Sequence, residues 1–227
     1  METLQRYLLP EGKGFISVTG GGGKTSFLIS FGRYLRDRGL SVLLTTTTRI
    51  ESPKMRDYDA DLVFSDESIL RHRPSKGETV YYAERHIMDP EKWTAPREEV
   101  LSVLASWYDA VLCEADGSRH LPLKIHTERD PVIHPATTGT VAVMGLWGIG
   151  EAVDSAVFGD GRTGVVDEAY LDWYLKAPEG LMKGMTGHKL VLLNGAESYP
   201  VPDLSLPEGV GLIAASLREG RILSYVL

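Results

Sequence analysis

The feature that most constrains the fold of this chain is a run of four glycines between an apolar strand and a helix. Residues 15–19 are mostly apolar or β-branched, Gly20 to Gly23 follow, and Lys24 and Thr25 come next. Residues 27–38 carry apolar side chains at helical spacing, and residues 41–48 are rich in β-branched side chains. Strand, loop, helix and strand in this order predict a βαβ unit, and therefore a parallel sheet.

The glycine run is typical of a phosphate-binding loop. Glycines let backbone N–H groups approach phosphate oxygens more closely than residues with a Cβ atom allow. Lys24 is expected to neutralise the β- and γ-phosphates, and the Thr25 hydroxyl to bind Mg²⁺ at the start of the helix. Val18 stands where the standard pattern has its first glycine, so the loop is a variant. The predicted nucleotide-binding residues here are Thr19, Gly20, Gly21, Gly22, Gly23, Lys24, Thr25 and Ser26.

The rest of the chain continues the alternation of strands and helices. With 227 residues and 43% hydrophobic content, we expect one α/β domain over 1–227, with a less regular insertion near 52–96. The fold class is P-loop NTPase-like, with a mainly parallel sheet flanked by helices and room for an antiparallel strand at the C-terminus. Further helices are predicted at 96–107 and 165–176, and further strands at 60–64, 78–83, 109–114, 139–144, 189–193, 210–214 and 221–226.

Charge and composition exclude several functions. The net charge is −7 and no basic face stands out, so we expect no nucleic-acid partner. No stretch approaches the ~20 apolar residues of a membrane span, and the N-terminus lacks a secretory core. The single cysteine, Cys113, lies in an apolar run and is interpreted as a core residue. These features predict a cytoplasmic protein without a membrane partner.

A second constellation follows the strand at 109–114, which ends in Glu114 and is followed by Asp116. A P-loop site needs a carboxylate opposite its lysine and threonine to hold Mg²⁺ directly or through water. We assign Glu114, with Thr25, to the metal. Asp116 is expected to orient the acceptor or a water molecule, which makes Lys24 and Asp116 the predicted catalytic residues.

Together these segments resemble the YqeC-type proteins, a family named for an accessory role toward selenium-dependent molybdenum hydroxylases. The resemblance implies a P-loop fold and a role in maturing a selenium-containing cofactor, with a molybdenum hydroxylase or a cofactor-maturation protein as partner. The glycine core and the later acid also resemble the ATP site of Mur-type ligases. The residues that carry the family resemblance are 18–25, 44–49, 114–118, 121–124, 130–133, 178–181, 183–184 and Asn194.

The nucleotide is predicted to be ATP, with GTP not excluded. Proteins that read guanine often place Asn-Lys-x-Asp after a late strand, and here Asn194 is followed by Gly195 and, in place of the aspartate, Glu197. Asn194 is retained as a nucleotide-binding residue.

The acceptor side of the site is predicted from polar residues near strand ends. Thr47 and Arg49 follow the strand beside the glycine loop, and Arg119 and Lys124 follow the acidic strand. We therefore expect these four residues to bind an anionic substrate. The function that follows is Mg²⁺-dependent NTP hydrolysis or phosphoryl transfer. Two alternatives stay open: a small-molecule kinase or Mur-like ligase outside selenium metabolism, and a non-catalytic nucleotide switch that docks on a partner.

Overall fold

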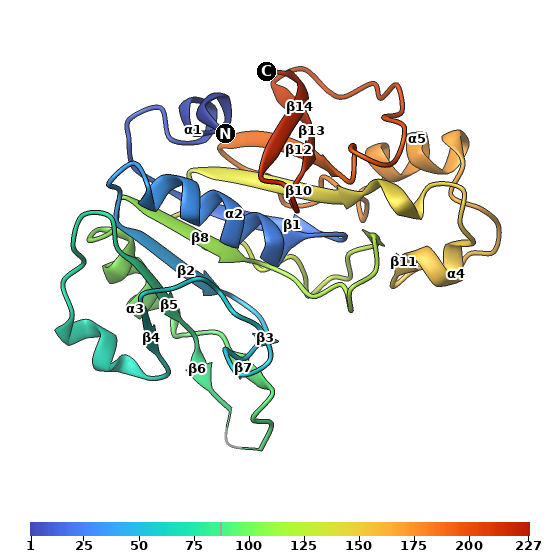
Figure 1. Ribbon diagram of the computed structural model, residues 1–227. Helices are drawn as coiled ribbons and strands as arrows, with labels where there is room; N and C mark the ends of the chain where they lie inside the picture. Colours follow the sequence, from blue (N-terminus) through green and yellow to red (C-terminus); the bar gives the residue numbers. More distant parts are fainter. Residues whose placement is uncertain (87) are drawn as a thin grey trace.

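A nine-stranded sheet forms the centre of the protein, in the order β14-β13-β12-β10-β1-β8-β2-β5-β4 (Figure 1). The computed structural model describes residues 1–86 and 88–227. Every neighbouring pair is parallel except β13 with β14. The predicted P-loop NTPase-like α/β fold is thus confirmed, including the antiparallel C-terminal strand. The strands are β1 (Gly14–Gly20), β2 (Val42–Thr46), β4 (Leu62–Phe64), β5 (Thr79–Tyr82), β8 (Ala110–Glu114), β10 (Gly139–Gly145), β12 (His188–Asn194), β13 (Val210–Ser216) and β14 (Arg221–Val226).

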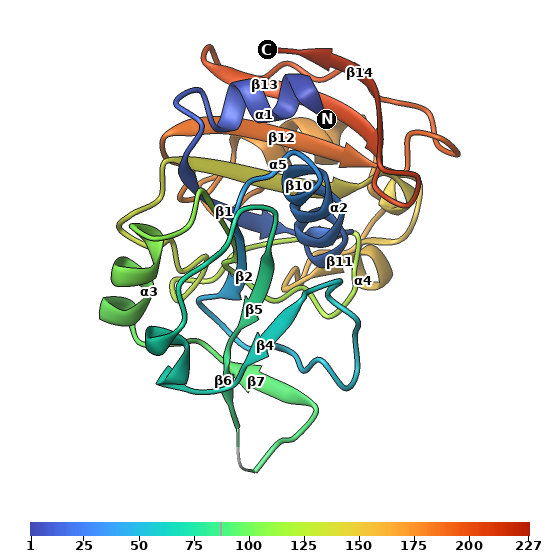
Figure 2. The ribbon, with the colours of Figure 1, turned by 60° about the vertical axis from the view of Figure 1, so that its left-hand side comes forward.

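Helices cover both faces of this sheet, because the central strands are apolar on both sides. The alternation of side chains along β1 sends Ile16 and Val18 to one face and Phe15 to the other. On the first face pack α1 (Glu2–Leu8) and α2 (Lys24–Arg36), and on the opposite face pack α3 (Glu98–Ala105) and α5 (Glu168–Lys176) (Figure 2). Cys113 is fully buried on the α3 side, as a core residue should be.

Two small sheets lie beyond the central one. The first joins β3, β7 and β6, and the second pairs β9 with β11. The sequence did not predict these short strands, nor α1 and the short α4. Within residues 52–96, β4 and β5 extend the central sheet, whereas β6 and β7 belong to the first small sheet. The remaining elements are β3 (Ile50–Glu51), η1 (Glu67–Arg71), β6 (Glu84–Arg85), β7 (Lys92–Thr94), β9 (Leu123–Lys124), η2 (Leu146–Gly148), α4 (Val153–Ala156) and β11 (Val157–Phe158).

Two helices begin later in the structure than the sequence predicts. The helix predicted from residue 165 begins at Glu168, because the Asp167 carboxylate accepts from Tyr170 N and caps it. Val165 instead forms an isolated antiparallel bridge with Ala152. The helix predicted at 96–107 is shortened to α3, which begins two residues after Pro96.

The order of the strands indicates where a ligand site is expected. The chain leaves β1 toward β2 on one side of the sheet and later returns to β10 on the other side of β1. Ligands of open α/β sheets bind where the order reverses, outside the carboxyl ends of the strands. In this protein that position is the end of β1, beside β8 and β10. Within the two described ranges, no helix is both long and apolar enough to cross a membrane.

Candidate functional site

The glycine loop joins the end of β1 to the start of α2, as the sequence predicts. Gly20 has φ +90°, and a Cβ atom there would collide with the carbonyl oxygen of Val143 on β10. A Cβ atom on Gly21 would lie 2.7 Å from the carbonyl oxygens of Leu121 and Pro122. The loop is therefore glycine-rich because neighbouring backbone encloses it on two sides.

Lys24 begins α2 and points back under the loop. Its ammonium donates to Gly20 O at 2.7 Å and to Ser118 Oγ at 3.1 Å, and it lies 3.1 Å from Asp116 Oδ1. The side chain is only 4% exposed. Lys24 thus forms two hydrogen bonds and a buried ion pair with Asp116.

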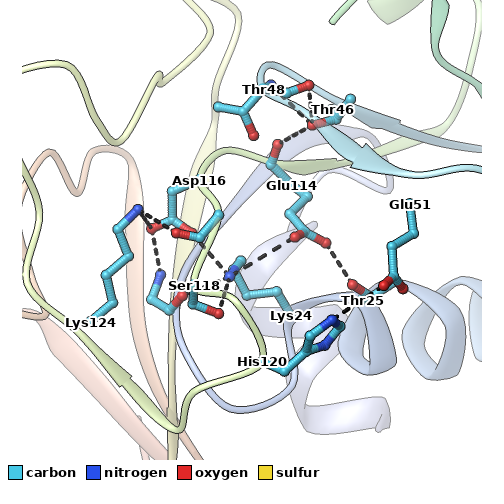
Figure 3. Close-up of polar contacts among 12 residues, drawn as sticks. Lys24, Thr25, Thr46, Thr48, Glu51, Glu114, Asp116, Ser118, His120 and Lys124 are labelled. Carbon is cyan, nitrogen blue, oxygen red and sulfur yellow. Dashed lines mark hydrogen bonds and ion pairs between the residues drawn. The ribbon is translucent and has the colours of Figure 1, made fainter. Parts of the chain in front are cut away.

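Thr25 and Glu114 meet beside Lys24 (Figure 3). The Thr25 hydroxyl donates to Glu114 Oε2 over 2.8 Å, and burial raises the pKa of Glu114 even though Lys24 opposes this effect. Adjacent ligands of an octahedral Mg²⁺, with bonds of about 2.1 Å, stand about 3 Å apart. The two oxygens therefore have the chemistry and the spacing of two neighbouring Mg²⁺ ligands.

Asp116 lies beneath the loop and is fully buried. Its Oδ2 accepts from Gly20 N at 2.9 Å, and His126 Nε2 lies 2.8 Å from the same oxygen. Burial alone would raise the pKa of Asp116, but Lys24, the hydrogen bond with His126 and the charge of Lys124 together hold it well below its usual range. Asp116 does not line the cavity above the loop, in contrast to the acceptor-facing place that the sequence suggested.

Lys124 is buried rather than displayed on the surface. Its ammonium donates to Gly117 O at 2.7 Å, forms an ion pair with Asp130 and lies 3.8 Å from Asp116 Oδ2. It is 1% exposed and does not line the cavity. Thr47 is likewise outside the cavity, because its hydroxyl donates to Val132 O at 2.6 Å. Thr19 is fully buried below the loop, where its hydroxyl has no hydrogen-bond partner among the residues described.

His126 is a part of this network that the sequence analysis missed. Its Nδ1 lies 2.9 Å from the carbonyl oxygen of Gly180, an acceptor, so Nδ1 carries the hydrogen. The available signal was its spacing of two from Lys124, which places both side chains on one side of an extended segment. His126 thus connects Asp116 to the turn that precedes β12.

An open cavity of about 260 Å³ lies over the loop. Arg49 and Arg119 line it, as the sequence predicted for the acceptor side, and so do Thr25, Ser26 and Glu114. Further lining residues come from segments to which the sequence assigned no role, and they are Glu51, Arg56, Lys92, His120 and Trp147.

Asn194 lines this cavity, and its amide group forms hydrogen bonds within the protein. Nδ2 donates to Gly22 O at 2.8 Å, and Oδ1 accepts from Leu217 N at 3.1 Å. A second cavity, of about 420 Å³, shares Ser26, Trp147 and Asn194 with the first and is also lined by Glu197. Asn194, which the sequence assigns to nucleotide binding, therefore holds the glycine loop in place through its amide.

Comparisons with known proteins match the part of the chain that contains this site. A family model described as YqeC protein matches residues 16–159, which include the glycine loop, Glu114 and the cationic residues of the cavity. A protein of Escherichia coli (strain K12), named Uncharacterized protein YqeC, is 33% identical over 143 residues, which are 62% of this chain and 55% of that protein. The chain thus spans about half the length of the curated relative it matches. No solved structure matches the chain.

Proposed function

The chain belongs to the YqeC family, and we propose that it binds a nucleoside triphosphate with Mg²⁺ and hydrolyses it or transfers its phosphoryl group. The observation that carries this proposal is the convergence of Lys24, Thr25 and Glu114 at a glycine loop that opens into a cavity. The start of α2 supplies a positive field for phosphate, while the N–H groups of Gly20, Gly21 and Gly22 donate to Asp116 Oδ2, Val143 O and Leu121 O.

Each residue has a distinct part in this function. The turn from Gly20 to Gly23 and the start of α2 would border the phosphates, and Thr25 and Glu114 would hold Mg²⁺, which would neutralise the charge that develops on the phosphate oxygens. Asp116 positions Lys24 and the loop through its contacts with Lys24 Nζ and Gly20 N. Lys24 Nζ donates to Gly20 O and to the Ser118 hydroxyl, and the hydroxyl, at 3.1 Å, is the uncharged side-chain partner that a phosphate oxygen would replace.

We propose ATP as the nucleotide, with GTP as the alternative. The Asn194 amide is engaged by Gly22 and Leu217, which supports a role in shaping the loop over one in reading guanine. The second cavity would receive the nucleoside, since it adjoins the loop and is lined by Trp147 and Tyr199.

The biological role that we propose is maturation of a selenium-containing molybdenum hydroxylase in the cytoplasm, with that enzyme or a cofactor-maturation protein as partner. It follows from the family resemblance. Cys113 is fully buried, and burial raises the pKa of its thiol, so this thiol does not carry selenium. Selenium would then arrive on an activated small molecule or on another protein.

Nucleotide binding is tested by calorimetry of ATP with and without Mg²⁺, on the wild type and on Glu114→Gln. We expect Mg²⁺ to strengthen ATP binding to the wild type by at least ~10-fold and to have little effect on Glu114→Gln, because the amide is a poorer ligand for a hard cation. Glu99→Gln, on the exposed side of α3, is the matched control. Equal losses with and without Mg²⁺ would show that Glu114 is structural.

The biological role is tested in the source organism. Deletion of the gene should lower selenium-dependent hydroxylase activity and leave selenoprotein synthesis unchanged. Complementation with the wild type or Glu99→Gln should restore activity, whereas Glu114→Gln should not. Full hydroxylase activity in the deletion strain would remove the selenium role and leave nucleotide binding as the proposed function.

A further inference from the structure

The cavity over the glycine loop holds more positive charge than its part in phosphate binding explains. Five Lys and Arg side chains line it against two Glu side chains, in a chain whose net charge is −7. Lys24 belongs to the loop. The other four are Arg49, Arg56, Lys92 and Arg119, and His120 lies beside them. These five residues are called the cationic wall below.

Three segments distant in sequence build the cationic wall. Arg49 immediately precedes β3, and Lys92 begins β7, its partner in the small sheet. The small sheet therefore presents cations to the cavity as a rigid unit. Arg119 and His120 reach the same cavity from the turn that follows β8.

Glu51 lies close to three residues of the cationic wall, but its single negative charge does not neutralise their positive charges. His120 Nε2 lies 3.2 Å from Glu51 Oε1, Lys92 Nζ lies 3.7 Å from the same oxygen, and Arg56 lies 3.9 Å from Oε2. One carboxylate thus faces three basic side chains, two of them at distances beyond a normal hydrogen bond. Arg49 and Arg119 have no carboxylate partner among residues 1–86 and 88–227: Arg49 Nη2 lies 3.3 Å from His86 Nε2, and the Arg119 guanidinium lies 5.2 Å from the centre of the Phe158 ring. The wall therefore carries positive charge that no carboxylate neutralises.

The turn that carries Arg119 and His120 has an uncommon backbone. Arg119 has φ 49° and His120 has φ 65°, a region that side chains with a Cβ atom rarely adopt twice in succession. Strained backbone of this kind clusters at ligand sites. The turn is fixed by a hydrogen bond from Leu121 N to Ser118 O, and His120 reaches Glu51 (Figure 3). The conformation thus places a basic side chain among the residues that line the cavity.

We propose that the cationic wall binds a second, anionic small molecule beside the nucleotide, one that carries at least two negative charges on phosphate or carboxylate groups. This inference rests on the proposed function, in which the nucleotide phosphates occupy the loop and Lys24. Arginine forks and a lysine are the side chains that bind both anion types with charge-assisted hydrogen bonds.

The test measures anion binding to the full chain saturated with a non-hydrolysable ATP analogue and Mg²⁺, at constant ionic strength. Inorganic phosphate and succinate are titrated in separate calorimetric arms, so that the preferred anion class is identified. We expect saturable binding of at least one, weakened by ~10-fold or more in the double variant Arg56→Gln/Lys92→Gln. Arg119→Gln, from the turn that follows β8, should weaken binding of the same anion. Lys54→Gln, an exposed neighbour outside the cavity, should not.

Affinity for the ATP analogue is measured in the same variants. It should stay within about twofold of the wild type, because the wall serves the second ligand. If neither anion binds saturably, or if the variants weaken the ATP analogue as much as the anion, the proposal is wrong. If the analogue fails to bind at all, the same titrations on nucleotide-free protein still test the wall, since its variants leave the loop intact. Failure of the nucleotide proposal is thereby separated from failure of this one.

Discussion

At the scale of single residues, Asp116 links the glycine loop to the buried side chains beneath it. It receives the Gly20 N–H, faces the ammonium of Lys24 and contacts His126, all without exposure to solvent. A buried carboxylate is stable only with such partners. For the same reason, replacement of Lys24 would leave a buried charge and would alter stability as well as phosphate binding.

We predict that Asp116→Asn destabilises the fold by about 3–5 kcal/mol, because it leaves Lys24 and Lys124 without their shared carboxylate. Urea denaturation followed by circular dichroism measures this loss. Asp172→Asn is the matched control: its exposed i,i+4 pair with Lys176 should contribute about 0.3–0.5 kcal/mol. If Asp116→Asn lowers the free energy of unfolding as little as the control does, the buried charges under the loop do not stabilise the fold.

At the scale of elements, Asn194 connects the end of β12 to two neighbours. Its amide bonds the glycine loop through Gly22 O and the segment after β13 through Leu217 N. A Cβ atom on Gly23 would lie 2.6 Å from Asn194 Nδ2, so loop and strand end fit closely. The end of β12 thus supports the loop from the side opposite Glu114.

We predict that Asn194→Ala lowers the affinities for ATP and GTP by the same factor, about 10-fold, because two hydrogen bonds that fix the loop are lost. Calorimetry with both nucleotides gives the two ratios. Glu197→Gln, which changes the second cavity and leaves the loop contacts intact, is the comparison variant. A loss confined to GTP in Asn194→Ala would identify the amide as a guanine reader.

At the scale of the whole molecule, three aspartates link peripheral segments to the body of the fold. Asp59 bonds Arg33 and Arg36 on α2, Asp160 bonds Arg162 and Tyr170, and Asp130 pairs with Lys124. Burial alone would raise the pKa of each of these carboxyls, but their hydrogen-bonded partners outweigh it and hold the pKa below its usual value.

A lowered pKa in the folded state means that these carboxylates stabilise the protein above the ordinary Asp pKa of about 3.9. That contribution is lost as the pH falls below this value. We predict that the urea midpoint falls more steeply between pH 4 and pH 2.5 in the wild type than in Asp59→Asn/Asp160→Asn. The shift is modest, since Arg33 and Arg162 are partly exposed to solvent. If the urea midpoints of the two proteins fall equally with pH, Asp59 and Asp160 do not stabilise the fold as proposed.

Local pattern alone determined the βαβ start of the fold, the glycine loop, and the meeting of Thr25 with Glu114. Each depends on neighbours in sequence or on the rule that parallel strands end at one edge. The same reasoning located strands such as β12 and β14, because their apolar or β-branched runs are continuous.

Only the tertiary structure decided how the rest of the site is assembled. Lys124 resembles an exposed cation in the sequence, yet it is buried beside Asp130 and Asp116. Arg56 and Lys92 carry no local signal of a common site. Their positions depend on how the chain folds around the small sheet of β3, β7 and β6, and the cavity they line is completed by the left-handed turn at Arg119 and His120. Such contacts join residues far apart in sequence, and their free energies come from packing and charge pairing that periodicity does not encode.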